Sequence, residues 1–421
     1  MNLLKTSFLS SIATVIKILT GFIVNKVLAL YVGPVGIAQI GQLQNFFSIV
    51  SNLSNFSISQ GVTKYVSFYG EEEDKQIKYI NAAITISFIA SIITGLLIIV
   101  LHTYLSILLL KSDQYADIFI YIGIFLIFYA INSILLAAVN GFKKIRKFTL
   151  INVSQSFFGL ALSILLTVKW ELKGAMYAYV LSQTLVLLIS FVFLLKEDWV
   201  KKIRLRKVDR SILKSYSNYT IMSMIHILTV PVSFIIIRTY ISETLSSDDA
   251  GYWQGLTKIS DTYLMFITMS LSVYYLPRLS EIKDDLKLKK EIFDGYKLII
   301  PILTVILFAV YFMKDIAIVI LYSKEFLEMR ELFLFQLIGD FFKIASWLIS
   351  FNMLVKEMTK HVIITELFYS ITLTVLSIVF INIFGLIGVT YAYSITYFLY
   401  FLMVGYMMRH ILFLKAKQRN G

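Results

Sequence analysis

Cysteine is absent from this sequence of 421 residues, proline occurs only 4 times, and only 15% of the residues are charged. The absence of cysteine excludes disulfides and thiolate metal sites, so the compartment has to be inferred from topology. The scarcity of charge has a larger consequence, because 58% of the residues are hydrophobic and the mean hydropathy is +0.78. These values exclude an ordinary soluble domain and indicate an integral membrane protein.

Several catalytic signatures are also missing. The sequence contains no G-x-x-x-x-G-K-[ST] phosphate loop, so we expect that the chain does not hydrolyse ATP itself. It contains no H-E-x-x-H motif, and its four histidines at positions 102, 226, 361 and 410 lie far apart. No catalytic pair of carboxylates is visible on the predicted outer face. We therefore expect a transporter rather than an enzyme, without a metal or a bound cofactor.

Apolar stretches of about 20 residues recur along the whole chain, which is the length that a helix needs to cross a bilayer core of roughly 30 Å. The first stretch is too long and too interrupted for a cleaved signal peptide, so we expect it to be retained. The pattern predicts an all-α integral membrane protein with twelve spans, at residues 8–32, 37–60, 79–101, 115–139, 149–168, 174–195, 215–241, 250–277, 292–313, 328–352, 361–383 and 386–408.

Lysine and arginine are distributed unevenly between the two sides of these spans. The N-terminus, the even-to-odd connections and the C-terminal tail hold 27 of the 39, and the opposite connections hold 5. This bias predicts that both termini are cytoplasmic. It also accounts for the net charge of +13 without nucleic acid as a partner. The external connections are all short, so we expect no external catalytic domain.

The two halves of the sequence resemble each other in order. Four short segments match: "IKILT" with "IHILT", "GIAQ" with "GYWQ", "GAMYAYVLS" with "GVTYAYSIT", and the lysines at 143 and 147 with those at 356 and 360. The offsets of 209, 215, 214 and 213 residues are nearly constant. Six spans per half give both halves one orientation, a parallel repeat about an axis along the membrane normal. We predict an N-terminal lobe at 1–200, a basic cytoplasmic linker at 201–214 and a C-terminal lobe at 215–421.

Polar side chains are concentrated in spans one, two, seven and eight, which are the corresponding first pair of spans in each half. A lysine near the middle of the bilayer costs ~3 kcal/mol on the insertion scale, so repeating it in corresponding helices indicates one water-accessible cavity between the lobes. The predicted headgroup-binding residues are Lys17, Lys26, Lys64, Arg238, Lys258 and Arg278. The predicted polar or ion-coupling residues are Asn25, Gln39, His226, Gln254 and Asp261.

Structural interpretations compete with this one at the span ends. Lys26 and Arg238 lie within two turns of the outer surface and could snorkel there. Lys64 and Arg278 could be ordinary cytoplasmic anchors. Lys17 is the hardest to explain structurally, because it lies in the middle of its span without an acidic neighbour at helical spacing.

Pairing or packing could explain the remaining candidates. Lys258 and Asp261 could neutralise each other at i, i+3, and Asp340 and Lys343 in span ten are interpreted as a neutral structural pair. For His226 a packing role competes with a functional one. Taken as a set, the predicted cavity is cationic, and we therefore expect an anionic cargo such as a phosphate or pyrophosphate.

The motif "YVGPVGIAQIGQLQNF" after the first span, the six-plus-six repeat and the basic residues of spans one, two, seven and eight resemble the Wzx-type polysaccharide flippases. These belong to the superfamily that also contains multidrug exporters of the MATE type and the lipid II flippases. The segments "AGYWQGLTKISDTYL" and "YYLPRLSEI" resemble the branch that moves O-antigen units and the enterobacterial common antigen lipid. The resemblance covers essentially the whole chain.

The resemblance implies a flippase of the bacterial inner membrane that carries undecaprenyl-pyrophosphate-linked oligosaccharide to the periplasmic leaflet by alternating access. It further implies O-antigen polymerase and chain-length regulator as partners beside membrane lipids, and coupling to a proton or sodium gradient. An ion-coupled drug exporter is an alternative, but spans one and two contain no acidic residue to bind a coupling ion. A polysaccharide polymerase or ligase is disfavoured by the short external connections and the duplication.

Overall fold

The computed structural model describes residues 3–413, except residues 57, 272–274, 276–277, 280–281, 283 and 357. The side chains of residues 3–11, 217–227, 269–270 and 354 also lie outside the description. The described residues form helices and their connections without any strand, which confirms the predicted all-α class. By its internal contacts the chain divides into two compact units, Met1–Ile235 and Ile236–Gly421.

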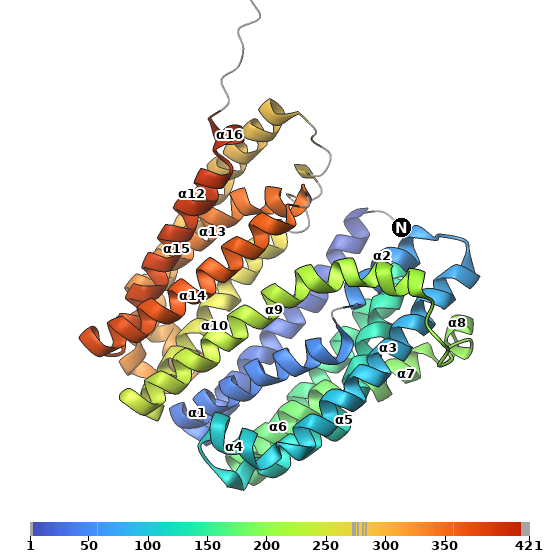
Figure 1. The fold of residues 1–421 in the computed structure, drawn as a ribbon. Coiled ribbons are helices and arrows are strands. Elements are labelled where there is room, and N and C mark those ends of the chain that lie inside the picture. The colour runs from blue at the N-terminus through green and yellow to red at the C-terminus, as the bar shows by residue number, and fades with distance from the viewer. Residues whose placement is uncertain are drawn as a thin grey trace, which may run out of the picture. The chain divides into compact units, whose positions relative to one another are not determined.

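The first unit is built from long helices of the N-terminal half (Figure 1). Within it α1 packs against α6, and α3 packs against α5. Its elements are α1 (Leu3–Asn55), α2 (Ser59–Phe68), α3 (Glu73–Val100), α4 (His102–Leu110), η1 (Asp113–Tyr115), α5 (Ala116–Gly141), α6 (Ile145–Thr184), α7 (Val186–Leu194), α8 (Asp198–Lys201) and the first part of α9 (Arg210–Thr244).

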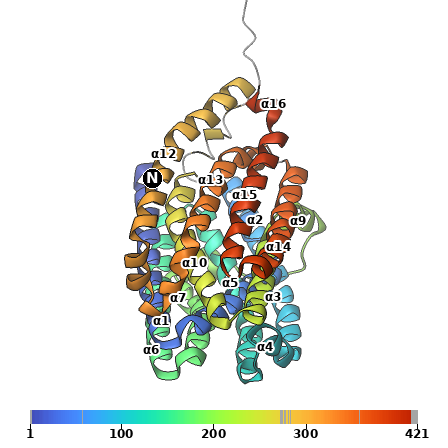
Figure 2. The same cartoon turned by 90° about the vertical axis from the view of Figure 1, so that its left-hand side faces the viewer.

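The second unit contains the remainder of α9 and the helices that follow. Helices α13 and α14 both pack against α15, as Figure 2 shows. Its further elements are α10 (Ser247–Ser270), α12 (Asp285–Leu321), the 3₁₀ segment η3 (Lys324–Leu332), α13 (Phe333–Val355), α14 (Thr359–Phe384), α15 (Ile387–Met407) and α16 (Arg409–Leu412).

Eight helical stretches of the described chain are long and apolar enough to cross a membrane. Two of them, Ile12–Asn55 and Ile145–Leu194, have 44 and 50 residues, enough for two crossings each. They break where two crossings would meet: at Gly33, with φ 62° and Pro34 after it, and at Glu171, with φ 48°. Helix α10, with four charged residues, does not belong to the eight, and neither does α9, of which residues 217–227 lie outside the described side chains. Counting both broken helices twice and adding α9 and α10 accommodates the twelve predicted spans, a number that stays a prediction.

Some elements differ from the sequence-based expectation. Helix α12 has 37 residues and extends beyond the predicted span at both ends. Its N-terminal extension is explained by Asp284, which caps the helix ahead of the apolar segment by accepting a hydrogen bond from Lys287 N. The predicted start of span ten is instead the charged segment η3. Helix α4, within a predicted external connection, was not predicted, since its 9 residues are too few to cross a bilayer.

The local geometry of the two matched G-x-x-YAY segments repeats. Glu171 and Gly385, 214 residues apart, both have positive φ, at 48° and 67°. Three residues later, Gly174 and Gly388 are each closely approached by the backbone of the preceding helical segment. The same turn conformation and the same close approach at one offset support the predicted duplication.

The basic linker is hydrogen-bonded to α3 of the first unit. The buried side chain of Asn81 donates to Lys202 O at 3.3 Å and accepts from Arg204 N at 3.0 Å. Beyond the linker, α9 still contributes to the core of this unit through Tyr216, whose hydroxyl donates to Tyr79 O at 3.0 Å. The division by contacts therefore falls inside α9, between residues 235 and 236. The lobe boundaries inferred from the sequence stay a prediction.

Candidate functional site

Lys17 lies in the first half of α1 with an exposed side chain, and it has no ion pair with any described residue. One turn later the hydroxyl of Thr20 donates to Ile16 O at 2.9 Å and to Lys17 O at 3.1 Å, so it is satisfied within the helix. A Cβ placed on the neighbouring Gly21 would meet no atom within 4 Å. The Lys17 side chain and the space beside Gly21 are therefore not covered by described residues, although Thr20 between them is buried.

The other candidates of the first unit have different surroundings. Asn25 and Lys26 are half-buried further along α1. Lys64 is exposed on α2, with Nζ 5.8 Å from the ring centroid of Tyr65. Gln39 donates from Nε2 to Leu110 O at 3.1 Å and thereby binds the last carbonyl of α4, which gives it a structural partner. The side chain of His226 lies outside the described residues.

In the second unit, Arg238 of α9 is only 1% exposed. Its Nη2 donates to Oε1 of Gln254 on α10, and its guanidinium carbon lies 5.4 Å from the ring centroid of Trp253. The structure thus brings together two of the predicted site residues, Arg238 and Gln254. It places the arginine in the contact between α9 and α10 and not at a surface where it would snorkel.

Lys258 and Asp261 are both exposed on α10. The ion pair of Asp261 is with Lys343 of α13, whose Nζ lies 3.7 Å from Oδ1. The structure therefore shows neither of the two pairings considered from the sequence, since Lys343 pairs with Asp261 and not with Asp340. Near the other end of this unit, Arg278 Nε lies 3.5 Å from Glu291 Oε2 of α12.

The sequence did not single out the side-chain network around Asp340. This carboxylate is fully buried in α13 and accepts hydrogen bonds from Ser260 Oγ at 2.7 Å, from the Tyr263 hydroxyl, and from the Tyr393 hydroxyl at 2.7 Å. Its donors come from α10 and α15, so the carboxylate ties three helices together. An acidic residue in an apolar span was the available signal.

The candidate residues thus differ in what they could do chemically. Lys17, Lys64 and Lys258 present exposed ammonium groups that can bind an anion. Arg238, Gln39 and Gln254 have partners inside their own unit.

The comparison with known protein families gives a match over most of the chain. A model of the family described as polysaccharide biosynthesis protein matches residues 3–283. The chain belongs to the polysaccharide biosynthesis protein family. Among curated members with similar sequences, the lipid III flippases of Escherichia coli (strain K12) and Shigella flexneri are each 28% identical over 402 residues, which cover 95% of this chain and 97% of theirs.

Solved structures of other proteins share the fold of this polysaccharide biosynthesis protein. An inward-facing multidrug resistance transporter of the MATE family in the MOP superfamily matches with a TM-score of 0.80 and 14% identity over 94% of this chain and 96% of its own. The lipid II flippase MurJ in an inward closed conformation matches with a TM-score of 0.73 and 14% identity over 96% and 87%. The fold is that of MOP transporters, and these related proteins are transporters and flippases rather than enzymes.

Proposed function

We propose that this protein is a flippase that moves undecaprenyl-pyrophosphate-linked O-antigen repeat units from the cytoplasmic to the periplasmic leaflet of the bacterial inner membrane. One observation carries the proposal: the similarity to lipid III flippases extends over nearly the full length of both chains. The family match over residues 3–283 supports the same class of substrate.

In this proposal, basic side chains of both units contact the pyrophosphate while the polyprenyl chain stays in the lipid. Lys17 of α1 and Lys258 of α10 are the strongest candidates, because both are exposed and neither has an ion pair among the described residues. Alternating access would expose a pyrophosphate bound by these ammonium groups to each leaflet in turn. Both termini are proposed to be cytoplasmic, from the distribution of Lys and Arg.

A proton or sodium gradient is the proposed energy source, with no bound cofactor, and O-antigen polymerase and chain-length regulator are the proposed protein partners. His226 and Asp261 remain the proposed coupling residues from the sequence. If His226 couples protons, transport by His226→Gln should lose the dependence on pH between about 5.5 and 8 that the unsubstituted protein shows, the range in which histidine changes charge. Identical pH profiles for both proteins would exclude this role.

The test is a deletion strain from which lipid-linked oligosaccharide is extracted and quantified together with surface polysaccharide. The proposal expects the deletion strain to accumulate undecaprenyl-pyrophosphate oligosaccharide and to lose surface polymer. The unsubstituted gene should return both to normal levels. Lys17→Ala and Lys258→Ala should restore them poorly, whereas Lys324→Ala, an exposed lysine of η3 outside the predicted cavity, should restore them fully. Normal surface polymer together with new drug sensitivity in the deletion strain would instead favour an exporter of the MATE type.

A further inference from the structure

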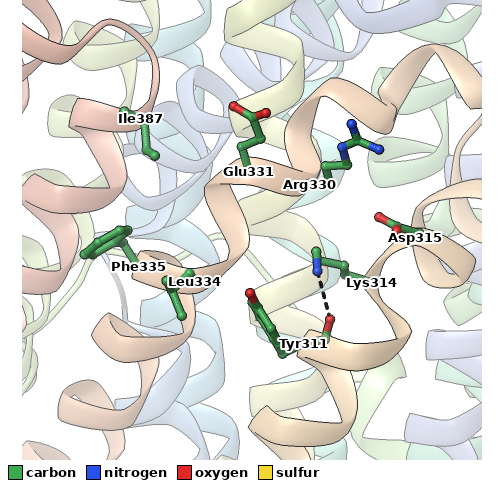
Figure 3. Close-up of a pocket in the computed structure, with 8 residues that line it drawn as sticks. All are labelled: Tyr311, Lys314, Asp315, Arg330, Glu331, Leu334, Phe335 and Ile387. Atoms are coloured by element: carbon green, nitrogen blue, oxygen red, sulfur yellow. Dashed lines mark hydrogen bonds between the residues drawn. The ribbon is translucent and has the colours of Figure 1, made fainter.

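A cavity of about 420 Å³ lies within the second unit, between the end of α12, η3 and the starts of α13 and α15. It is lined by Tyr311, Lys314, Asp315, Arg330, Glu331, Leu334, Phe335 and Ile387 (Figure 3). None of the residues predicted to bind the transported substrate lines it. The charge bias of the connections predicts this end of α12 to be external.

The cavity contains two positive and two negative side chains. Lys314 and Asp315 come from α12, and Arg330 and Glu331 come from η3. Although they line one cavity, none of the four forms an ion pair within 4.0 Å with any described residue. The ammonium of Lys314 donates instead to Tyr311 O at 3.3 Å and lies 4.1 Å from the Tyr311 ring centroid. A lining of balanced but unpaired charges is complementary to a ligand that carries both signs.

The surface of α12 next to this cavity is apolar and exposed. Phe308 and Phe312 are 61% and 77% exposed, and with Asp315 they share one face of the helix at i, i+4 and i+7. An exposed apolar strip thus ends at the charged lining. Figure 3 shows the charged side chains from the top centre to the right of the cavity, with the apolar Leu334 and Phe335 to the left. This is the arrangement that a phospholipid requires, with acyl chains on the helix face and its headgroup at the membrane surface.

We propose that this cavity binds the phosphoethanolamine headgroup of a zwitterionic phospholipid. The ligand ammonium would be bound by Asp315 and Glu331, and the ligand phosphate by Lys314 and Arg330. The acyl chains would lie along Phe308 and Phe312. The same headgroup chemistry is available from a soluble glycerophosphoethanolamine, so the test has to separate the lipid from the free headgroup.

The experiment is native mass spectrometry of the purified full-length protein with equimolar phosphatidylethanolamine, phosphatidylcholine and phosphatidylglycerol. We expect phosphatidylethanolamine to be retained in preference to both others. Phosphatidylcholine lacks N–H donors for the carboxylates, and phosphatidylglycerol lacks the positive charge. Asp315→Asn/Glu331→Gln and Lys314→Gln/Arg330→Gln should each reduce its occupancy by about tenfold. The matched control Lys324→Gln/Glu328→Gln changes exposed charges of η3 outside the cavity and should change nothing.

Two outcomes would overturn the proposal. Phosphatidylethanolamine occupancy that neither double substitution alters would show that the cavity does not bind the headgroup. Stronger phosphatidylglycerol binding in Asp315→Asn/Glu331→Gln, with no preference for phosphatidylethanolamine in the unsubstituted protein, would show a plain anion site. If soluble glycerophosphoethanolamine at the same concentration displaced the lipid, the ligand of the cavity would be the free headgroup and not the phospholipid. The four substituted side chains are at least partly exposed, so the variants are expected to fold, and unchanged size-exclusion profiles would verify this.

Discussion

Gly174 and Gly388 occupy equivalent close contacts in the two halves of the chain. A Cβ on Gly174 would lie 1.9 Å from Leu166 O, and one on Gly388 would lie 2.1 Å from Phe380 O, in each case eight residues earlier. Both contacts are with backbone, which cannot move aside as a flexible side chain would. The two glycines therefore allow the segments before and after each turn to pack against each other closely.

Replacing either glycine by alanine should destabilise the fold. We expect Gly174→Ala and Gly388→Ala each to cost about 1–3 kcal/mol through overpacking. Gly405→Ala is the matched control, because a Cβ there meets nothing within 4 Å and alanine in a helix is better by about 0.5–1 kcal/mol. Thermal unfolding in detergent, followed by size-exclusion chromatography, measures the order. Equal midpoints for Gly174→Ala and Gly405→Ala would contradict the close contact.

Arg238 and Lys258 should respond differently to truncation. Arg238→Ala removes a buried guanidinium from Gln254 and Trp253, so we expect a loss of about 2 kcal/mol in stability as well as reduced transport. Lys258→Ala changes an exposed side chain and should alter stability by less than about 0.5 kcal/mol while it still reduces transport. Unfolding midpoints measured beside surface polysaccharide separate the two effects. A fully stable Arg238→Ala would contradict the structural role of Arg238.

Asp340 and Asp261 provide a second contrast. Asp340→Ala would leave three hydroxyls without their acceptor in the second unit, so we expect a cost of at least about 2 kcal/mol. Asp261→Ala removes a carboxylate that is 62% exposed and has a single partner at 3.7 Å, and should cost less than about 1 kcal/mol. Chemical denaturation of the two variants in parallel would measure the difference. If Asp340→Ala were the milder change, the hydroxyl network would not be important for stability.

The class and many element boundaries were predictable because hydropathy reports local properties of the chain. The break at Gly33 and Pro34 lies in the connection predicted between spans one and two, and that at Glu171 lies between spans five and six. Hydropathy did not predict the helical segments that lie outside the apolar stretches. Helix α12 continues through a charged segment ahead of its apolar part, and η3 is helical in a segment too charged to be distinguished from a loop.

Side-chain partners were harder to predict, because they depend on which helices pack together. Asp340 and Lys343 are one turn apart, and that spacing alone suggested a pair. The structure gives Lys343 a partner on α10 and gives Asp340 hydroxyl donors from α10 and α15, up to 80 residues away in sequence. The contact of Arg238 with Gln254 was also unforeseen, although both residues were candidates. The sequence therefore predicted which residues are candidates for a site, but not which of them pair with each other.

Glu197, which follows α7, should make stability depend on pH. Burial alone would raise the pKa of Glu197, but hydrogen bonds from Lys144 and Lys147 lower it below its ordinary value of 4.5. The folded protein thus keeps the carboxylate ionised where the unfolded chain protonates it. The resulting stabilisation is present above about pH 4.5 and is lost as the pH falls towards the folded pKa.

Glu197→Gln should therefore lower the unfolding midpoint at pH 7 and reduce its further decrease on acidification to pH 4. Asp198→Asn is the control, because Asp198 is adjacent but fully exposed, with Lys201 as its partner at 2.9 Å. We expect the control to follow the unsubstituted protein at every pH. Parallel curves for Glu197→Gln and the unsubstituted protein would show that this carboxylate does not contribute.

Asn81 should protect the basic linker from proteases. Its side chain binds the backbone of Lys202 and Arg204, and Thr85 Oγ1 accepts from Arg206 N at 3.2 Å. We expect trypsin to cut Asn81→Ala between residues 201 and 210 several-fold faster than the unsubstituted protein, because cleavage requires the linker to leave α3. Asn382→Ala, which removes a hydrogen bond from Tyr240 in the second unit, is the control. Equal cleavage of all three proteins would mean that the linker is not bound in solution.

Helix α9 has a consequence for how the protein is synthesised. The first unit includes Ile212 and Tyr216 in its core, although Ile212 lies in the last part of the linker and Tyr216 lies after it, at the start of the helix that enters the second unit. A ribosome that has completed only the six predicted N-terminal spans has therefore not yet supplied the residues that complete this unit. We therefore expect the core of the nascent first unit to close only after the start of α9 has been made, so the two predicted halves should not mature as independent molecules if the chain is divided at the linker.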